Sequence, residues 1–290
     1  MKKVLAVLLA ALMVFAVCAC TKAPAETDTD TDTDASVVAG DDAETPDDAE
    51  TPDDAQTTDD AETPDDSADE DTIVMATNAY FKPYEYYDGD KIVGIDAEIA
   101  EKIAEKLGKT LVISDMQFDS ILTAVQTGSV DFGMAGMTVT DERLESVNFT
   151  VSYANGVQAI IVKEDSPIAS VDDLYADGAD YKVGVQLGTT GDIYSTDDFG
   201  DKVVQYSNGN EAVLALLGGS IDCVIIDNEP AKALVAANEG LKILETSYAD
   251  EDYAICVSKE NTELLDQLNA IIVELTADGT IDEIVGKYIQ

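Results

Sequence analysis

Short apolar runs typical of buried strands alternate with amphipathic helical segments along residues 73–290 of this 290-residue chain. When a helix connects one strand to the next, the two strands run parallel and the helices cover the faces of the sheet. The alternating stretch is 218 residues long, which is enough for two small lobes. We therefore predict an α/β fold of two lobes, each a mainly parallel sheet flanked by helices.

The spacing of the apolar residues also predicts the individual elements. Asp96 is expected to cap a helix whose apolar stripe ends at Gly108. The expected strands cover residues 73–77, 111–114, 130–135, 182–186, 203–206 and 221–226. The expected helices cover residues 96–107, 119–127, 211–217, 230–237, 262–277 and 280–288.

Residues 1–20 have the pattern of a secretory signal. Two lysines precede an apolar run over residues 4–17 that is too short to cross a membrane comfortably. The run leads into Cys18-Ala19-Cys20, which resembles a lipobox, the processing signal of lipoproteins. The small Ala19 makes Cys20 the expected lipidated residue, and an ordinary cleaved signal with incidental cysteines is the alternative. Lipidation would anchor the chain on the extracytoplasmic face of the cell membrane, with the lipid as its only membrane contact.

Residues 21–72 form an acidic, repetitive segment that we expect to be a disordered tether. It holds 21 acidic residues and one lysine, a net charge of −20, and a six-residue unit, Asp-Asp-Ala-Glu-Thr-Pro, recurs through much of it. So little apolar surface cannot offset the entropy of folding, and like charges with spaced prolines favour an extended chain. A calcium-binding repeat is the alternative, but the glycine-bearing loops of known calcium repeats are missing.

The composition of residues 73–290 excludes several classes of function. The segment holds 39 acidic and 13 basic residues, and its net charge of −26 argues against nucleic acid or an anionic bilayer as a partner. The chain has no histidine, so Ser-His-Asp and Cys-His nucleophilic systems and histidine-based zinc sites are excluded. We expect no metal and no cofactor. Cys223 and Cys256 lie in apolar strand-like runs, which favours buried free thiols.

Arg143 is the only arginine in the chain, and the other fifteen basic residues are lysines. The planar fork of arginine is needed where a carboxylate or phosphate is bound through two parallel hydrogen bonds. Arg143 follows Gly136-Met137-Thr138 at the end of an expected strand, and Thr140 is placed to cap the helix that carries it. An exposed helix arginine is the alternative interpretation.

Two further strand ends carry groups that could bind a ligand. The loop over residues 186–191 contains Gly188, Thr189 and Thr190, and it points backbone N–H groups and a helix start at a bound anion. A purely structural turn is the alternative. Asp227 lies where an apolar strand ends, and ligands of open α/β sheets bind at such ends. These groups and Arg143 match a zwitterion, with its α-carboxylate at Arg143 and its α-ammonium at Asp227.

Six segments of the chain match a known family. They are residues 76–86 (ATNAYFKPYEY), 93–96 (VGID), 122–131 (LTAVQTGSVD), 136–143 (GMTVTDER), 183–190 (VGVQLGTT) and 277–280 (ADGT). Through them the chain from Thr72 to Gln290 resembles the polar amino-acid-binding lipoproteins of ABC importers, the solute-binding protein family 3.

The resemblance implies a type II periplasmic-binding-protein-like clamp whose hinge is crossed near residues 153–156 and 251–253. Lobe I would comprise residues 73–155 plus 253–290, and lobe II residues 156–252. The resemblance also implies a monomeric receptor that captures a polar L-amino acid and delivers it to an ABC permease and its ATPase. An enzyme similar to the periplasmic cyclohexadienyl dehydratases, and a ligand-sensing lipoprotein without a transporter, are the alternatives.

The resemblance assigns roles to residues around the ligand backbone. The arginine that matches Arg143 binds the ligand carboxylate bidentately, together with the N–H groups at Thr138 and Thr190. The aspartate that matches Asp227, the carbonyl of Gly136 and the hydroxyl of Thr138 take the ammonium.

Other positions match the pocket for the ligand side chain. Phe81 and Phe118 fit the aromatic pair that sandwiches this side chain, and core packing is their alternative role. Relatives that bind basic amino acids or glutamine often carry aspartate where this chain has Asn78. Asn78 and Gln186 would present two neutral amides, which fits glutamine or cystine, whereas Asp96 and the overall acidity keep arginine and lysine open.

Overall fold

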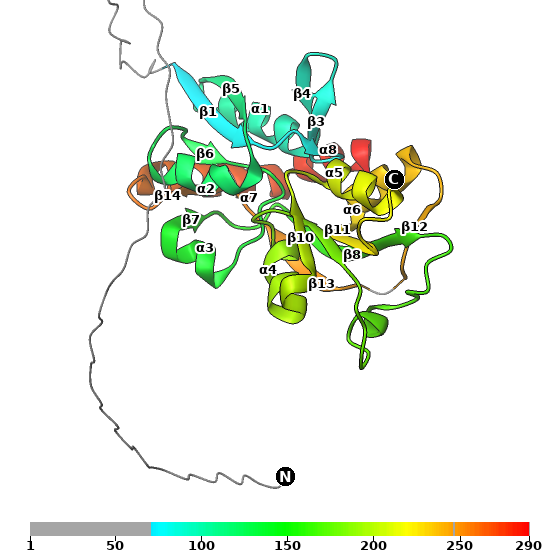
Figure 1. Ribbon diagram of the computed structural model, residues 1–290. Coiled ribbons are helices and arrows are strands. Elements are labelled where there is room, and N and C mark those ends of the chain that lie inside the picture. The colour runs from blue at the N-terminus through cyan, green and yellow to red at the C-terminus, as the bar shows by residue number, and fades with distance from the viewer. Residues whose placement is uncertain (1–70, 246, 290) are drawn as a thin grey trace, which may run out of the picture. The chain divides into compact units, whose positions relative to one another are not determined.

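The computed structural model describes residues 71–245 and 247–289, which build two mixed sheets with helices packed against them (Figure 1). The predicted signal, the predicted lipidation site Cys20 and residues 21–70 of the predicted tether lie outside the described residues. Within the described residues, no helix has the length and apolar character needed to cross a membrane.

The first sheet has five strands in the order β5-β1-β6-β14-β7. Strands β5 and β6 pair parallel to β1, whereas β14 pairs antiparallel to β6 and β7. Side chains of β1 alternate between the faces, so Ile73 and Met75 pack with helices α1, α7 and α8, and Ala76 packs with α2. The elements are β1 (Thr72–Thr77), β5 (Thr110–Asp115), β6 (Phe132–Gly133), β7 (Val147–Phe149), β14 (Cys256–Ser258), α1 (Ile95–Leu107), α2 (Phe118–Gln126), α7 (Thr262–Ala277) and α8 (Thr280–Tyr288).

The second sheet runs in the order β10-β9-β11-β8-β12, and β13 also pairs with β8. Strands β10 and β11 are parallel to β9, and the long β8 is antiparallel to its three partners. Helices α5 and α6 contribute to the apolar cluster on one face, and Phe199 at the end of α4 packs on the other. The elements are β8 (Ala154–Lys163), β9 (Val183–Gln186), β10 (Val203–Tyr206), β11 (Cys223–Asp227), β12 (Leu241–Ile243), β13 (Ala249–Tyr253), α4 (Thr190–Phe199), α5 (Gly209–Leu217) and α6 (Asn228–Ala237).

Smaller elements complete the fold. A three-stranded hairpin sheet follows β1, and the short helix α3 leads from the pocket into β7. Two single-turn 3-10 helices lie beside the second sheet. The bounds are β2 (Tyr80–Phe81), β3 (Glu85–Asp88), β4 (Lys91–Val93), α3 (Asp141–Ser146), η1 (Val171–Leu174) and η2 (Gly200–Lys202).

The fold class is confirmed, but each sheet is mixed where we predicted mainly parallel strands. The antiparallel members lie where the chain passes between the sheets: β8 begins after one passage and β14 follows the other. A strand that enters directly from the neighbouring sheet has no helix to reverse it, so it pairs antiparallel. The lobe boundaries at 155/156 and 252/253 remain predictions.

The predicted cap at Asp96 is wrong. Helix α1 begins at Ile95, and its N-cap is Gly94, which has a φ of 130°. A Cβ atom at Gly94 would lie 2.2 Å from the Tyr84 carbonyl oxygen, so this position requires glycine. Asp96 is therefore already inside the first turn, and its side chain is buried and faces inward.

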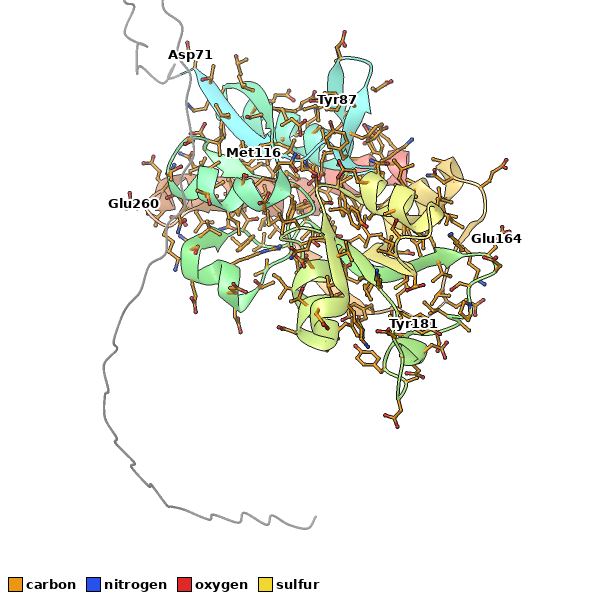
Figure 2. All side chains as sticks on the ribbon, viewed as in Figure 1. Asp71, Tyr87, Met116, Glu164, Tyr181 and Glu260 are labelled. Carbon is orange, nitrogen blue, oxygen red and sulfur yellow. The ribbon has the colours of Figure 1, made fainter. Side chains whose placement is uncertain are left out.

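Other local predictions are confirmed. Thr140 caps α3 by accepting a hydrogen bond from the backbone N–H of Arg143. The predicted helices 262–277 and 280–288 coincide with α7 and α8. Cys223 and Cys256 are buried free thiols. Side chains fill the space between the sheets and their helices (Figure 2), so the strand ends between the sheets are held by a continuous core.

Candidate functional site

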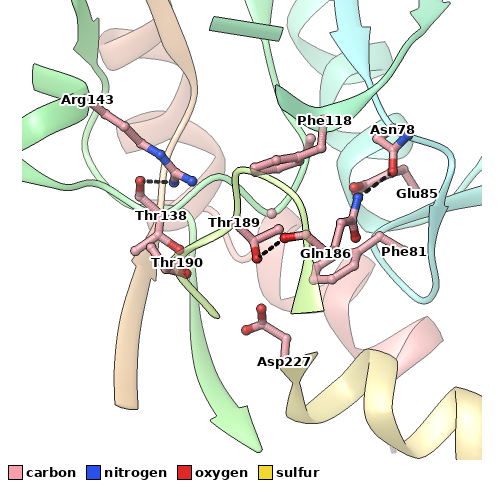
Figure 3. Close-up of a pocket in the computed structure, with 12 residues that line it drawn as sticks. Asn78, Phe81, Glu85, Phe118, Thr138, Arg143, Gln186, Thr189, Thr190 and Asp227 are labelled. Atoms are coloured by element: carbon pink, nitrogen blue, oxygen red, sulfur yellow. Dashed lines mark hydrogen bonds between the residues drawn. The ribbon is translucent and has the colours of Figure 1, made fainter. Parts of the chain in front are cut away.

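A pocket lies where the ends of several strands of the two sheets meet (Figure 3). From the first sheet it receives the segment after β1, the start of α2 and the segment between β6 and α3. The second sheet contributes the end of β9, the start of α4 and the end of β11. Its lining residues are Asn78, Phe81, Glu85, Phe118, Ala135, Gly136, Thr138, Arg143, Gln186, Thr189, Thr190 and Asp227.

Arg143 is the buried cation of this pocket, with 4% of its surface exposed. Its Nη1 donates to the carbonyl of Thr138 at 2.6 Å, and its Nη2 donates to the carbonyl of Gly188 at 3.0 Å. The guanidinium carbon lies 5.5 Å from the centre of the Phe118 ring, within the range of a cation–π contact. No carboxylate of residues 71–245 and 247–289 forms an ion pair with it. Burial lowers the pKa of Arg143, and the nearby charge of Glu251 opposes that shift.

The loop before α4 borders the pocket from the second sheet. Thr189 caps α4 by accepting from the Asp192 N–H at 3.2 Å, and its hydroxyl donates to the Gln186 carbonyl at 2.8 Å. The first N–H groups of a helix have no partner inside the helix, and α4 begins here at Thr190. The start of α4, with the positive end of its helix dipole, therefore borders the pocket, and the anion-binding role of this loop stays a prediction.

Asp227 is one of the two acidic residues that line the pocket, and it lies at the end of β11. Its Oδ1 accepts from the hydroxyl of Tyr253, and its Oδ2 accepts from Nε2 of Gln158 at 2.8 Å. Burial, with a further contribution from the charge of Glu251, raises the pKa of Asp227 well above its ordinary value. A cation placed against Asp227 would favour the ionised form.

The remaining predicted residues gather at the other end of the pocket. Nε2 of Gln186 donates to Oδ1 of Asn78 at 2.9 Å, so the two neutral amides meet across the two sheets (Figure 3). Nδ2 of Asn78 in turn donates to the Met116 carbonyl at 2.7 Å. Phe81 and Phe118 are both buried and both line the pocket.

Asp96 does not line the pocket, which corrects our prediction that it contacts the ligand. Its Oδ2 accepts from the Gly136 N–H and from the Tyr153 hydroxyl, both at 2.8 Å. Asp96 thus lies behind the wall and holds Gly136 in place. Burial raises its pKa to about 6, although these two donors work in the opposite direction.

Glu85 is a lining residue that our sequence reasoning did not single out. It is fully buried, and neither carboxyl oxygen has a hydrogen-bond donor within the part of the chain that the structure describes. Burial and the charge of the neighbouring Asp96 raise the pKa of Glu85 well above its ordinary value. The two carboxyl groups can share a hydrogen bond only when one of them carries a proton. The signal was weak, because one glutamate between tyrosines does not stand out among sixty acidic residues.

Glu251 is a second buried carboxylate that we placed at the hinge without giving it a role at the site. Its Oε2 accepts from the hydroxyl of Thr138 and from Nε2 of Gln158, both at 3.0 Å. Gln158 joins Glu251 to Asp227, so the two carboxylates share one amide. The only sequence signal was its place in a short polar segment before an apolar strand.

Two sheets that meet at a buried pocket holding a cation at one side and an acid at the other define a two-lobed solute-binding protein. The chain belongs to the bacterial extracellular solute-binding proteins, family 3, whose family profile matches residues 73–290. The resemblance carried by the six motifs is therefore confirmed.

Individual relatives agree with this assignment. The arginine-binding extracellular protein ArtP of Bacillus subtilis is 30% identical over 221 residues, covering 74% of this chain and 85% of that protein. A putative ABC transporter arginine-binding protein 2 of Escherichia coli K12 is 33% identical over 227 residues, covering 76% and 91%. A solved ancestral arginine-binding protein bound to arginine is 38% identical, with a TM-score of 0.70 over 76% of this chain and 99% of that one. A solved ancestral arginine-binding protein bound to glutamine is also 38% identical, with a TM-score of 0.71 over 76% of this chain and 98% of that one.

Proposed function

We propose that this protein captures a polar L-amino acid, with arginine as the expected ligand, and delivers it to an ABC permease and its ATPase. The observation that carries the proposal is the buried guanidinium of Arg143, which has no carboxylate partner among the described residues. An unpaired buried charge is costly, and a ligand α-carboxylate would neutralise it through two parallel hydrogen bonds. N–H groups at Thr138 and Thr190 would complete this end of the site.

The ligand ammonium would lie at Asp227. The carbonyl of Gly136 and the hydroxyl of Thr138 border the same pocket and would accept its remaining hydrogens. An ammonium carries three donors, so one carboxylate and two neutral oxygens would satisfy it. A ligand that touches both sheets would favour the closed arrangement of two lobes, which we propose as residues 73–155 plus 253–290 and residues 156–252.

The side chain of the ligand would extend between Phe81 and Phe118 toward Asn78 and Gln186. Two amides alone fit glutamine, but Glu85 adds a buried carboxyl group that has no hydrogen-bond donor among the described residues. A guanidinium would supply that donor and would also stack on the aromatic rings. The arginine-binding relatives support this choice, and the ancestral arginine-binding protein solved with glutamine bound supports glutamine as a second ligand.

We also propose that Cys20 carries a lipid that holds the protein on the extracytoplasmic face of the membrane. The lipobox-like residues support the anchor, and membership of an extracellular family supports the location. The acidic residues 21–72 would then act as a spacer between the membrane and the binding lobes.

A thermal-shift screen against the common L-amino acids tests the proposed function. Arginine at about a hundred times its Kd should stabilise the protein by roughly 2.7 kcal/mol, and glutamine should give a second, smaller shift. Anions without an α-ammonium serve as the control series. A screen in which no amino acid raises the melting temperature would overturn the proposal.

Changing Glu85 to glutamine should separate the two ligands. Loss of a charged partner should raise the Kd for arginine by about 10- to 100-fold, with little effect on glutamine. Burial and the charge of Asp96 raise the pKa of Glu85 well above its ordinary value, so the ionised carboxylate that a guanidinium needs becomes more populated as the pH rises. Arginine affinity should therefore rise with pH in the wild type and lose this dependence in Glu85→Gln, as measured by calorimetry in two buffers.

The matched control for that change is Asp88→Asn on the same hairpin strand, where the carboxylate is exposed. It should leave the affinity and the pH dependence for arginine unchanged. An equal loss of arginine and glutamine binding in Glu85→Gln would contradict the assignment, because it would indicate general damage to the pocket.

A further inference from the structure

Glu251 occupies the point where the two sheets are joined. It lies on β13, which pairs with β8 of the second sheet, opposite Gly156. The residue that follows it accepts from the Val139 N–H at 3.1 Å, and the Ala254 N–H donates to the Met137 carbonyl at 3.0 Å. The end of β13 therefore contacts the segment that carries Thr138. The Glu251 side chain is buried where this strand and that segment meet.

The hydrogen bonds of Glu251 have a fixed direction. A carboxylate only accepts, so the Thr138 hydroxyl must donate to Oε2, over a distance of 3.0 Å. The lone pairs of the Thr138 oxygen are then left for another donor on the pocket side. If the threonine hydrogen pointed into the pocket instead, it would face the ligand ammonium, which also only donates.

The same rule fixes the amide of Gln158. Its Nε2 donates to Glu251 and to Asp227, at 3.0 Å and 2.8 Å. Turning the amide round would place its oxygen against two carboxylates. Glu251 and Asp227 together therefore keep the nitrogen of Gln158 between them. As a result, the Thr138 hydroxyl oxygen and the Asp227 carboxylate are both left to accept hydrogen bonds from the ligand ammonium.

We infer that Glu251 is a positioning residue of the ammonium site, which acts through the Thr138 hydroxyl and the Gln158 amide and does not line the pocket itself. The inference rests on the proposed function, because it requires an α-ammonium at Asp227. It also assigns the hinge strand a part in recognition: the strand that connects the sheets sets the polarity of the groups that receive the ligand. This polarity would select ligands that carry a positive α-ammonium.

Two substitutions at Glu251 separate the effect of side-chain shape from the effect of hydrogen-bond direction. Glutamine nearly preserves the shape but brings a donor group, whereas aspartate is shorter but still only accepts. Glu251→Gln should raise the Kd for L-arginine by about 10- to 100-fold and change the Kd for 5-guanidinopentanoate, which lacks the α-amino group, by less than about threefold. Glu251→Asp should retain more of the wild-type preference for arginine over this analogue. Calorimetry with both compounds measures the preference.

Asp250→Asn, an exposed carboxylate one position away on the same strand, is the matched control and should behave as the wild type. If Glu251 had a purely structural role, its substitutions would weaken the binding of L-arginine and of 5-guanidinopentanoate equally, or Glu251→Gln would be milder than Glu251→Asp because glutamine is nearly isosteric. Either result would overturn the inference. A wild-type protein that binds neither arginine nor glutamine would instead overturn the proposed function and this inference with it. Binding by the wild type that is unchanged in Glu251→Gln would overturn the inference alone.

Discussion

Arg143→Lys should raise the Kd for arginine by about 100-fold or more while the protein remains folded. Lysine keeps the positive charge, but one ammonium cannot bind both carboxylate oxygens in parallel and also reach the carbonyls of Thr138 and Gly188. Two charge-assisted hydrogen bonds are worth about 1.5–3 kcal/mol each, so losing the equivalent of one or two of them accounts for a change of this size. Calorimetry measures the Kd, and the melting temperature without ligand verifies folding.

The neighbouring Glu142 provides the control for this substitution. It is exposed on the same short helix, so Glu142→Gln should leave binding unchanged although it also alters charge near the pocket. Affinity close to that of the wild type in Arg143→Lys would remove Arg143 from the site and with it the observation on which the proposed function depends.

Asp227→Asn should be comparably severe for amino acids. The ammonium would lose its buried ionic partner, and breaking such a pair costs about 2–5 kcal/mol, which is at least about 30-fold in Kd. Tyr253 and Gln158 both donate to Asp227, so the asparagine can accept from only one side without opposing donors. Binding of L-arginine measured by calorimetry should fall by about 100-fold, and the melting temperature should fall slightly.

The loss in Asp227→Asn should be specific to the ammonium. The Kd for 5-guanidinopentanoate should remain within about threefold of the wild-type value, because that ligand makes no ion pair at Asp227. Glu239→Gln controls for the change in net charge, because Glu239 is an exposed carboxylate just beyond α6, the helix that Asp227 precedes. If both ligands were weakened equally, the residue would be supporting the pocket wall, and the ammonium would have to bind elsewhere.

The parts of the fold that could be predicted are those in which local pattern and tertiary packing agree. Helices α7 and α8 have a regular apolar stripe, and that stripe is the face they bury. Strand β13 could not be predicted, because its sequence, Ala249–Tyr253, is largely acidic and becomes a strand only through pairing with β8. The hairpin β2–β4 has the same origin: its tyrosines and charged residues give no clear alternation of apolar and polar positions.

The site divides in the same way. Arg143 and Asp227 could be predicted because they follow apolar strands, and strand ends converge in an α/β sheet. Glu85 and Glu251 do not stand out in the sequence, because their burial depends on contacts that are distant in sequence. Asp96 was misplaced for a related reason. An aspartate at a helix start usually caps the helix, and its actual partner, Gly136, lies 40 residues away.

The guanidinium of Arg143 donates to two carbonyls, that of Thr138 in the segment after β6 of the first sheet and that of Gly188 in the loop after β9 of the second sheet. Of its five N–H donors, these bonds leave some for a ligand carboxylate. Under the proposed closure of the two lobes, the guanidinium would gain the Gly188 carbonyl when the lobes approach and a carboxylate when the ligand binds. The single arginine of this chain would then act as a coincidence detector, because neither the anion nor the proposed closure of the lobes would alone complete its set of hydrogen bonds.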